Sequence, residues 1–282
     1  MNLRELRTVY LDELTPIYDN QEAISIFFVV AEHVTGRSKS SLLVSFETEL
    51  SPSDHDLFIV ILQKLKMGSP LQYILGEALF YNMTFKVSDA VLIPRPETEE
   101  LVDWIISDRQ GNKPLSILDI GTGSGCIAIA LEKNLKSALV SAIDISQQAL
   151  EIAKHNALHN KSIVNFIHAD ILDYIDEVKY DIIVSNPPYI TTQEKLDMHD
   201  NVISHEPHIA LFVDHDNPLL FYNVISDYAC TNLNCGGRLF FEINEQFGQQ
   251  VLDMLSRKGF SSIELRTDMQ GKARMVACTK DC

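Results

Sequence analysis

Four consecutive residues near the middle of the chain, Asn186-Pro187-Pro188-Tyr189, have side chains and spacing suited to methyl transfer onto nitrogen. They follow the apolar run Tyr180–Ser185, which is typical of a buried strand. An amide or aromatic NH2 nitrogen has a delocalised lone pair and reacts poorly. Two acceptors, the Asn186 side-chain oxygen and the Pro187 carbonyl, can hold both N–H bonds and leave the lone pair facing a methyl donor. The prolines restrict the backbone, and Tyr189 can lie against a flat target group. Glutamine and adenine both remain open as targets.

A glycine-rich turn follows the apolar segment 115–120 and has the composition of a ligand-binding loop. Glycines permit a tight turn and a close approach of the ligand to the backbone. A dinucleotide-binding loop has the spacing G-x-G-x-x-G, whereas this turn has G-x-G-x-G and follows Asp119. The acidic residue favours a ligand with an ammonium group over one with a pyrophosphate. The turn consists of Gly121, Thr122, Gly123, Ser124 and Gly125.

Acidic residues also end the next two predicted strands. Asp144 follows segment 139–143 and can accept hydrogen bonds from both hydroxyls of a ribose. Asp170 follows segment 164–168, where it can accept from an adenine amine while Ile171 packs against the ring. Ligands of open α/β sheets bind at the carboxyl ends of the strands, so these residues should meet Asn186 at one edge. Acceptors for an amino acid, a ribose and an adenine together predict S-adenosylmethionine, with S-adenosylhomocysteine as the product.

Hydrophobic periodicity divides the chain into three segments. Residues 1–75 repeat apolar side chains at three- and four-residue steps, which predicts a small helical domain. Residues 76–95 change to a two-residue period, which predicts a β-hairpin linker. Within residues 96–282, a helix is expected to start at Pro96, and from residue 114 onward strands alternate with helices, which predicts a doubly wound, mostly parallel α/β sheet. We expect strands at 115–120, 139–143, 164–168, 180–185, 237–243, 262–265 and 274–278, the last two antiparallel, and helices at 126–135, 147–158, 218–233 and 245–258.

Composition limits the partners and the location of the protein. The 282 residues carry a formal net charge of −16 without a Lys/Arg cluster, which disfavours tight nucleic-acid binding. No apolar run has the length of a membrane span, and the start of the chain lacks a signal-peptide pattern. His199, His205 and His208 match no zinc spacing, so we expect no metal. The cysteines form no CxxC pair and predict reduced thiols in a cytoplasmic protein; they are Cys126, Cys230, Cys235, Cys278 and Cys282.

Further motifs extend over both predicted domains. They are Pro-Leu-Gln-Tyr-Ile-Leu-Gly at 70–76, Ile-Pro-Arg-Pro-Glu-Thr-Glu at 93–99, the turn at 119–125, the Asn-Pro-Pro-Tyr element, Glu206-Pro207, and Gly236-Gly237 followed by Glu242. With these motifs the sequence resembles the release-factor glutamine methyltransferases of the PrmC (HemK) family. The run at 93–99 is the most specific of them, whereas Asn-Pro-Pro-Tyr alone is shared with adenine-N6 DNA methyltransferases.

The resemblance implies a class I S-adenosylmethionine-dependent methyltransferase with a Rossmann-like, seven-stranded sheet at 96–282. It implies a helical release-factor-binding domain at 1–75, joined by the hairpin at 76–95. The implied reaction methylates N5 of the glutamine in the Gly-Gly-Gln tripeptide of class I peptide chain release factors. Residues 121–125, Asp144, Ile171 and Asn186 would contact the cofactor. Asn186, Pro187, Pro188 and Tyr189 would contact the glutamine, with Asn186, Pro187 and Tyr189 catalytic.

Segment 212–219 departs from the family pattern, and two other substrates remain as alternatives. The family has a glycine-containing loop at this place, whereas this chain has none and is expected to turn at Asn217-Pro218. Two other substrates would fit the same chemistry. One alternative substrate is a ribosomal-protein glutamine. The other is adenine N6 in nucleic acid, which would need base flipping and a basic groove and which the negative charge disfavours.

Overall fold

The computed structural model describes residues 1–108, 113–197 and 200–282. The described chain forms two compact units. The first contains residues 1–76 together with the short helix α9 (Asp200–His205), and the second contains the remainder. Each unit has its own hydrophobic core.

The first unit is a group of helices with well-defined ends. It comprises α1 (Leu3–Leu14), α2 (Asn20–Thr35), α3 (Lys39–Val44), α4 (Pro52–Lys66) and α5 (Leu71–Leu75). Side chains of Asn2, Asp19 and Ser51 accept from backbone N–H groups in the first turns, which satisfies donors that the helices leave free. In the core, the Tyr10 hydroxyl donates to the Phe58 carbonyl at 2.6 Å, so the buried phenol keeps a partner. The pattern did not indicate α3.

A β-hairpin opens the second unit. Strands β1 (Glu77–Phe80) and β2 (Met83–Lys86) are joined by Tyr81 and Asn82. Both residues have positive φ, 50° and 58°, the conformation of a tight type I′ hairpin turn. The Asn156 side chain accepts from the Lys86 N–H at 2.7 Å and donates to the Lys86 carbonyl at 3.0 Å, so the hairpin is bonded to α8 of the same unit.

The second unit is built on a seven-stranded sheet with the order β10-β11-β9-β6-β3-β4-β5. Strands β9, β6, β3, β4 and β5 are parallel, and β11 is antiparallel to β9 and β10. The predicted mostly parallel sheet with an antiparallel end is therefore confirmed. The strands are β3 (Ser116–Ile120), β4 (Leu139–Asp144), β5 (Val164–His168), β6 (Tyr180–Ser185), β9 (Leu233–Glu242), β10 (Phe260–Thr267) and β11 (Ala273–Lys280).

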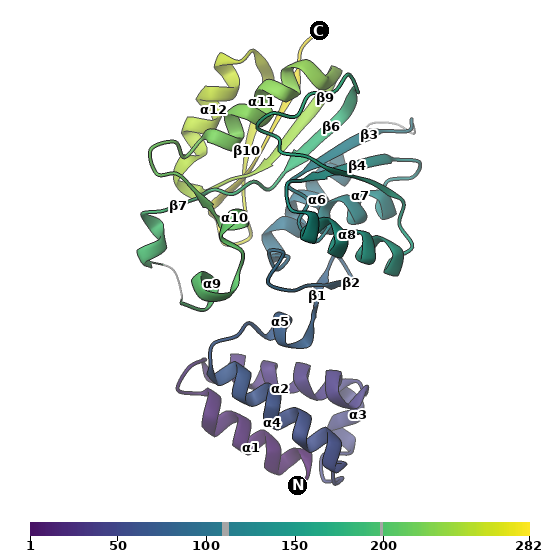
Figure 1. Ribbon diagram of the computed structural model, residues 1–282, viewed down its shortest axis with the longest axis vertical. Coiled ribbons are helices and arrows are strands. Elements are labelled where there is room, and N and C mark those ends of the chain that lie inside the picture. Colours follow the sequence, from purple (N-terminus) through teal and green to yellow (C-terminus); the bar gives the residue numbers. More distant parts are fainter. Residues whose placement is uncertain (109–112, 198–199) are drawn as a thin grey trace. The chain divides into compact units, whose positions relative to one another are not determined.

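Helices cover both faces of this sheet, as Figure 1 shows. One face carries α6 (Pro96–Asp108), α7 (Cys126–Asn134) and α8 (Gln147–His159). The other carries α11 (Leu220–Asn232) and α12 (Gly248–Arg257), which the short 3-10 turn η2 (Glu245–Phe247) precedes. Each face buries its own apolar cluster, which explains why the strands between them are almost continuously apolar.

The segment after the Asn-Pro-Pro-Tyr element contains short structure that the pattern did not indicate. Strands β7 (Ile190–Thr191) and β8 (Phe212–Val213) pair in parallel, with η1 (Glu194–Asp197) and α10 (His208–Leu211) in the intervening segment. In the glycine-free stretch after β8, the Asp214 carbonyl accepts from the Asn217 N–H at 3.0 Å, and the Asn217 carbonyl accepts from the Leu220 N–H at 3.1 Å. The turn is thus closed by backbone hydrogen bonds, at the place expected.

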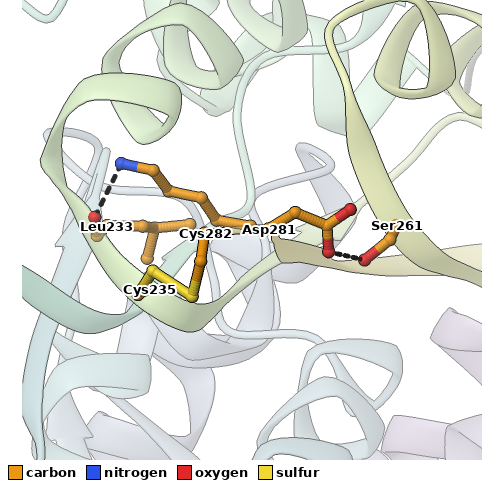
Figure 2. Close-up of a disulfide and its surroundings, with 6 residues drawn as sticks. Leu233, Cys235, Ser261, Asp281 and Cys282 are labelled. Atoms are coloured by element: carbon orange, nitrogen blue, oxygen red, sulfur yellow. Dashed lines mark hydrogen bonds between the residues drawn. A yellow bond between two sulfur atoms is a disulfide. The ribbon is translucent and has the colours of Figure 1, made fainter.

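The prediction that all cysteines are reduced thiols is wrong for two of them. Cys235, at the start of β9, forms a disulfide with Cys282, with 4.9 Å between the Cα atoms (Figure 2). Next to it, the Lys280 ammonium donates to the Leu233 carbonyl at 2.9 Å, and the Ser261 hydroxyl donates to the Asp281 carboxylate. The pairing of β11 with β9 brings the two cysteines together. A spacing of 47 residues carries no sequence signal of this pairing. Cys126, Cys230 and Cys278 are free.

Candidate active site

A cavity of about 320 Å³ opens at the carboxyl ends of β3, β4 and β6. This size is within the range of small-molecule sites. The predicted site residues that line it come from four separate segments: Gly121, Thr122, Gly123 and Ser124; Asp144; Asp170 and Ile171; and Asn186, Pro187 and Pro188. The rest of the wall is mainly apolar, including Val91, Ile93, Ile127, Ile143 and Phe221.

Backbone conformation shapes the glycine turn. Gly121, Gly123 and Gly125 all have positive φ, at 74°, 55° and 82°. The N–H groups of Gly121 and Thr122 both donate to the Ile143 carbonyl, at 2.9 and 3.0 Å, which holds the turn against the end of β4. Gly125 lies behind the cavity wall, where a Cβ atom would approach the Ala153 Cβ of α8 to 3.1 Å. Glycine is therefore required there for helix packing as well as for its conformation.

Asp119 lies at the base of the turn and has no exposed surface. It accepts a hydrogen bond from the Thr122 hydroxyl at 2.6 Å. Burial raises the pKa of this carboxyl to about 7, although the bond from Thr122 opposes the shift. An aspartate of this kind favours a cationic group close to it, because a nearby positive charge would stabilise its ionised form.

Asp144 connects the end of β4 to the glycine turn. Its carboxylate accepts from the Gly123 N–H and from the Ser146 N–H, each at 2.8 Å. Burial raises its pKa, and these two backbone donors act in the opposite direction. Asp170 accepts from the Leu172 N–H at 2.9 Å, and Ile171 lies beside it in the wall. Each carboxylate retains lone pairs for ligand hydroxyl or amine groups.

Asn186 and Pro187 line the cavity at the end of β6, which lies on the other side of β3 from β4 and β5. The Asn186 Nδ2 donates to the Thr98 hydroxyl at 3.3 Å. Tyr189 does not line the cavity; its hydroxyl donates to Glu242 at 3.0 Å, and its carbonyl accepts from Asn244 at 3.1 Å. Burial raises the pKa of Tyr189, and the charge of Glu242 adds to the effect. The phenol is therefore held as a neutral donor.

Two wall residues, Arg95 and Thr98, have no site role in the predictions from the sequence. Both belong to the run at 93–99, which was interpreted only as a helix start and a family motif. Arg95 forms an ion pair with Glu206, whose side chain is buried. The adjacent Ile209 and Ala210 form part of the wall. Charged residues close to a proline-rich stretch were the available signal, but only the fold places them at the cavity.

The described parts of the chain supply no metal centre. Within residues 1–108, 113–197 and 200–282, no group of three or more His, Cys, Asp and Glu side chains could hold a metal ion. His199 lies outside the described residues. None of the described helices combines the length and the hydropathy that crossing a bilayer requires.

The order of the strands and the acidic, glycine-rich edge of the sheet define an S-adenosylmethionine-dependent methyltransferase. Residues 101–209 match the model of the methyltransferase small domain, and residues 11–76 match that of the PrmC N-terminal domain. A solved methyltransferase from Pyrococcus furiosus has the same fold, with a TM-score of 0.54 and 18% identity over 72% of this chain and 91% of that one.

Similarity to curated relatives extends over the whole chain. The release factor glutamine methyltransferase of Flavobacterium psychrophilum is 42% identical over 98% of both chains. That of Bacteroides thetaiotaomicron is 39% identical over 97% of this chain and 99% of its own. The chain therefore belongs to the release factor glutamine methyltransferase family.

Proposed function

We propose that this enzyme transfers a methyl group from S-adenosylmethionine to N5 of the glutamine in the Gly-Gly-Gln tripeptide of class I peptide chain release factors. The relatives that are similar over their whole length are named for release factor glutamine methylation. The observation that carries the proposal is the position of Asn186 and Pro187 in the wall of a cavity that Gly123 and Asp144 also line.

The target side of the cavity would hold the glutamine amide. Because the Asn186 Nδ2 donates to Thr98, its Oδ1 remains to accept one N–H of the substrate. The Pro187 carbonyl would accept the other, and Pro188 would keep that backbone rigid. Tyr189 is bonded at its hydroxyl and at its carbonyl, so we assign it to support of this loop rather than to contact with the reacting nitrogen.

The cofactor side would hold the methyl donor, which supplies an electrophilic methyl group on a sulfonium. The turn from Gly121 to Ser124 would approach the amino-acid portion, close to Asp119. Asp144 would accept from the ribose hydroxyls, and Asp170 and Ile171 would contact the adenine. Gly125 supports the turn through its packing on α8. Asn186 lies in the same cavity and would contact both ligands. No side chain has to act as a base, because alignment and acceptors are sufficient.

The helical residues 1–75 would bind the release factor, and the hairpin region 76–95 would connect them to the catalytic residues 96–282. A protein partner with basic surface fits the net charge of −16 better than nucleic acid does. Because translation termination takes place in the cytoplasm, we place the enzyme there.

A labelled-methyl transfer assay tests this function. The enzyme is incubated with labelled S-adenosylmethionine and, in parallel, with purified release factor, ribosomal protein or DNA. We expect label only in the release factor. A release factor whose tripeptide ends in glutamate instead of glutamine serves as the matched control and should remain unlabelled.

Other outcomes of this assay would redirect or overturn the proposal. Label in the ribosomal protein or the DNA, and none in the release factor, would show that the target is wrong. Binding of S-adenosylhomocysteine, measured by calorimetry, is a separate readout for the cofactor side. Absence of that binding would contradict the assignment of the cavity itself.

A further inference from the structure

We propose that Thr98 and Glu242 are positioning residues that fix which end of the Asn186 carboxamide, the oxygen or the NH2 group, meets the substrate. The inference rests on the proposed function, since it explains how the target-side acceptor is oriented. Thr98 lies in the first turn of α6, Asn186 follows β6, and Glu242 ends β9. Thus three elements that are distant in the sequence meet at the cavity wall, which Thr98 and Asn186 line.

The two inner members of this network are removed from solvent. Glu242 is 1% exposed and Thr98 is 3% exposed. The two oxygens of the Glu242 carboxylate have different donors: Oε2 accepts from the Thr98 hydroxyl at 2.7 Å, and Oε1 accepts from the Tyr189 hydroxyl at 3.0 Å. A buried carboxylate retains its charge only when such donors compensate for lost water, so both hydroxyls are directed toward it.

The direction of each hydrogen bond follows from the number of hydrogens available. A threonine hydroxyl has one hydrogen, and Thr98 gives it to Glu242. Its oxygen can therefore only accept, and the group that it accepts from is the Asn186 NH2. The Asn186 oxygen is then left for the cavity, where an acceptor is needed. If the carboxamide were reversed, the NH2 would face the substrate N–H groups and repel them.

Glu242 thus determines the orientation of a side chain that it does not touch. The same carboxylate also holds the Tyr189 hydroxyl, so one buried group stabilises both ends of the Asn-Pro-Pro-Tyr element. A carboxamide free to rotate would spend part of its time in the reversed orientation. The effect should appear mainly in the chemical step, since apart from Asn186 the proposed cofactor contacts follow β3, β4 and β5.

The experiment compares two conservative substitutions at one position. Thr98→Val keeps the shape and removes the hydroxyl, whereas Thr98→Ser keeps the hydroxyl. We expect Thr98→Val to lower kcat roughly 10- to 100-fold, the scale of a misplaced reacting group, and to leave S-adenosylhomocysteine affinity within about threefold. Thr98→Ser should retain kcat within about threefold. Glu242→Gln should resemble Thr98→Val, because a carboxamide has only one oxygen and cannot accept from the Thr98 and the Tyr189 hydroxyl at once.

Thr191→Val is a matched control. Thr191 is also buried and also donates its hydroxyl to a carboxylate at 2.7 Å, that of Glu194, but it has no bond to Asn186. Loss of this bond should lower the melting temperature by an amount similar to Thr98→Val and leave kcat within about threefold. Equal loss of kcat in the two valine variants would reduce Thr98 to a structural role and overturn the proposal.

A second readout does not require catalysis. The side-chain NH2 of Asn186 is assigned by NMR from the signal that Asn186→Ala removes. Its hydrogen exchange should be slow in the parent and in Thr98→Ser, and fast in Thr98→Val. Unchanged exchange in Thr98→Val would overturn the inference. If the parent enzyme fails to methylate release factors, the proposed function fails, while this measurement still decides the role of Thr98.

Discussion

On the proposed cofactor side of the cavity, bonds between the ends of neighbouring strands hold the groups that would face the ligand, whereas on the proposed target side the bonds join segments further apart in the sequence. The Gly123 N–H reaches Asp144 across 21 residues, from one strand end to the next. The Asn186 amide depends on Thr98, 88 residues away, and Thr98 depends on Glu242 across 144 residues. One side is shaped by backbone conformation at successive strand ends, and the other by a chain of side chains. The cofactor side is therefore a property of the fold class, and the target side is a property of this arrangement of α6, β6 and β9.

The largest expected effect is on the target side. Asn186→Ala removes one acceptor for the substrate nitrogen and should lower kcat by about 1,000-fold, the upper range for loss of one preorganised hydrogen-bonding group at a reacting centre. Single-turnover methylation measures the effect, and calorimetry with S-adenosylhomocysteine measures the cofactor side. Affinity for S-adenosylhomocysteine should change much less than kcat. Full transfer activity in this variant would remove the basis for distinguishing the two sides.

Asp119 should make stability depend on pH. Its pKa in the folded protein is about 7, because burial disfavours the charge, and about 3.9 in the unfolded chain. Its contribution to stability is therefore complete below pH 4 and is lost as pH rises to 7, by about 1.4 kcal/mol per pH unit at most. Urea unfolding of the parent and of Asp119→Asn, without cofactor, measures the difference in free energy of unfolding between the two proteins. A difference that stayed constant from pH 5 to pH 7 would contradict the assignment of this pKa.

Asp144→Asn should weaken the cofactor side selectively. It removes the charge of a carboxylate that accepts from the Gly123 and Ser146 N–H groups and that would accept from the ribose hydroxyls. Loss of a charged hydrogen bond of about 1.5–3 kcal/mol corresponds to roughly 10- to 100-fold weaker binding of S-adenosylhomocysteine. The loss should appear in KM for S-adenosylmethionine, while kcat stays within a few-fold of the parent. A large fall in kcat would mean that the two sides are more closely coupled than their bonding indicates.

The smallest expected effect distinguishes packing from backbone conformation in the glycine turn. Gly125→Ala and Gly259→Ala both place a Cβ on a backbone with positive φ, at 82° and 86°, which costs about 1–2 kcal/mol. Only at Gly125 does the new Cβ approach a neighbour, Ala153 at 3.1 Å, whereas nothing lies within 4 Å at Gly259. Thermal unfolding should show a larger loss for Gly125→Ala by about 1 kcal/mol. Equal losses would mean that α8 yields to the added methyl group.

The accuracy of the sequence predictions follows the same division. Alternating apolar runs and turn residues predicted the seven strands, and β5 and β6 have the predicted bounds. The acidic residues at strand ends could be placed at one edge because parallel strands present their carboxyl ends together. Short elements such as α3 and the β7–β8 pair were missed, since a few residues do not show a period. The Cys235–Cys282 disulfide was missed because it depends on strand pairing at the end of the chain.

The sequence by itself determined the class of fold, the strand-end carboxylates and the glycine turn, and it predicted the pair of acceptors at Asn186 and Pro187. These features are local: each depends on residue types within one strand and the turn that follows it. Only the tertiary structure decided that Tyr189 faces Glu242 rather than the cavity, and that Thr98 lies between Glu242 and Asn186. A threonine in a helix start has no periodicity or motif that indicates its partner. Its hydrogen bonds form only when α6, β6 and β9 pack together, so the orientation of the central amide is determined by packing.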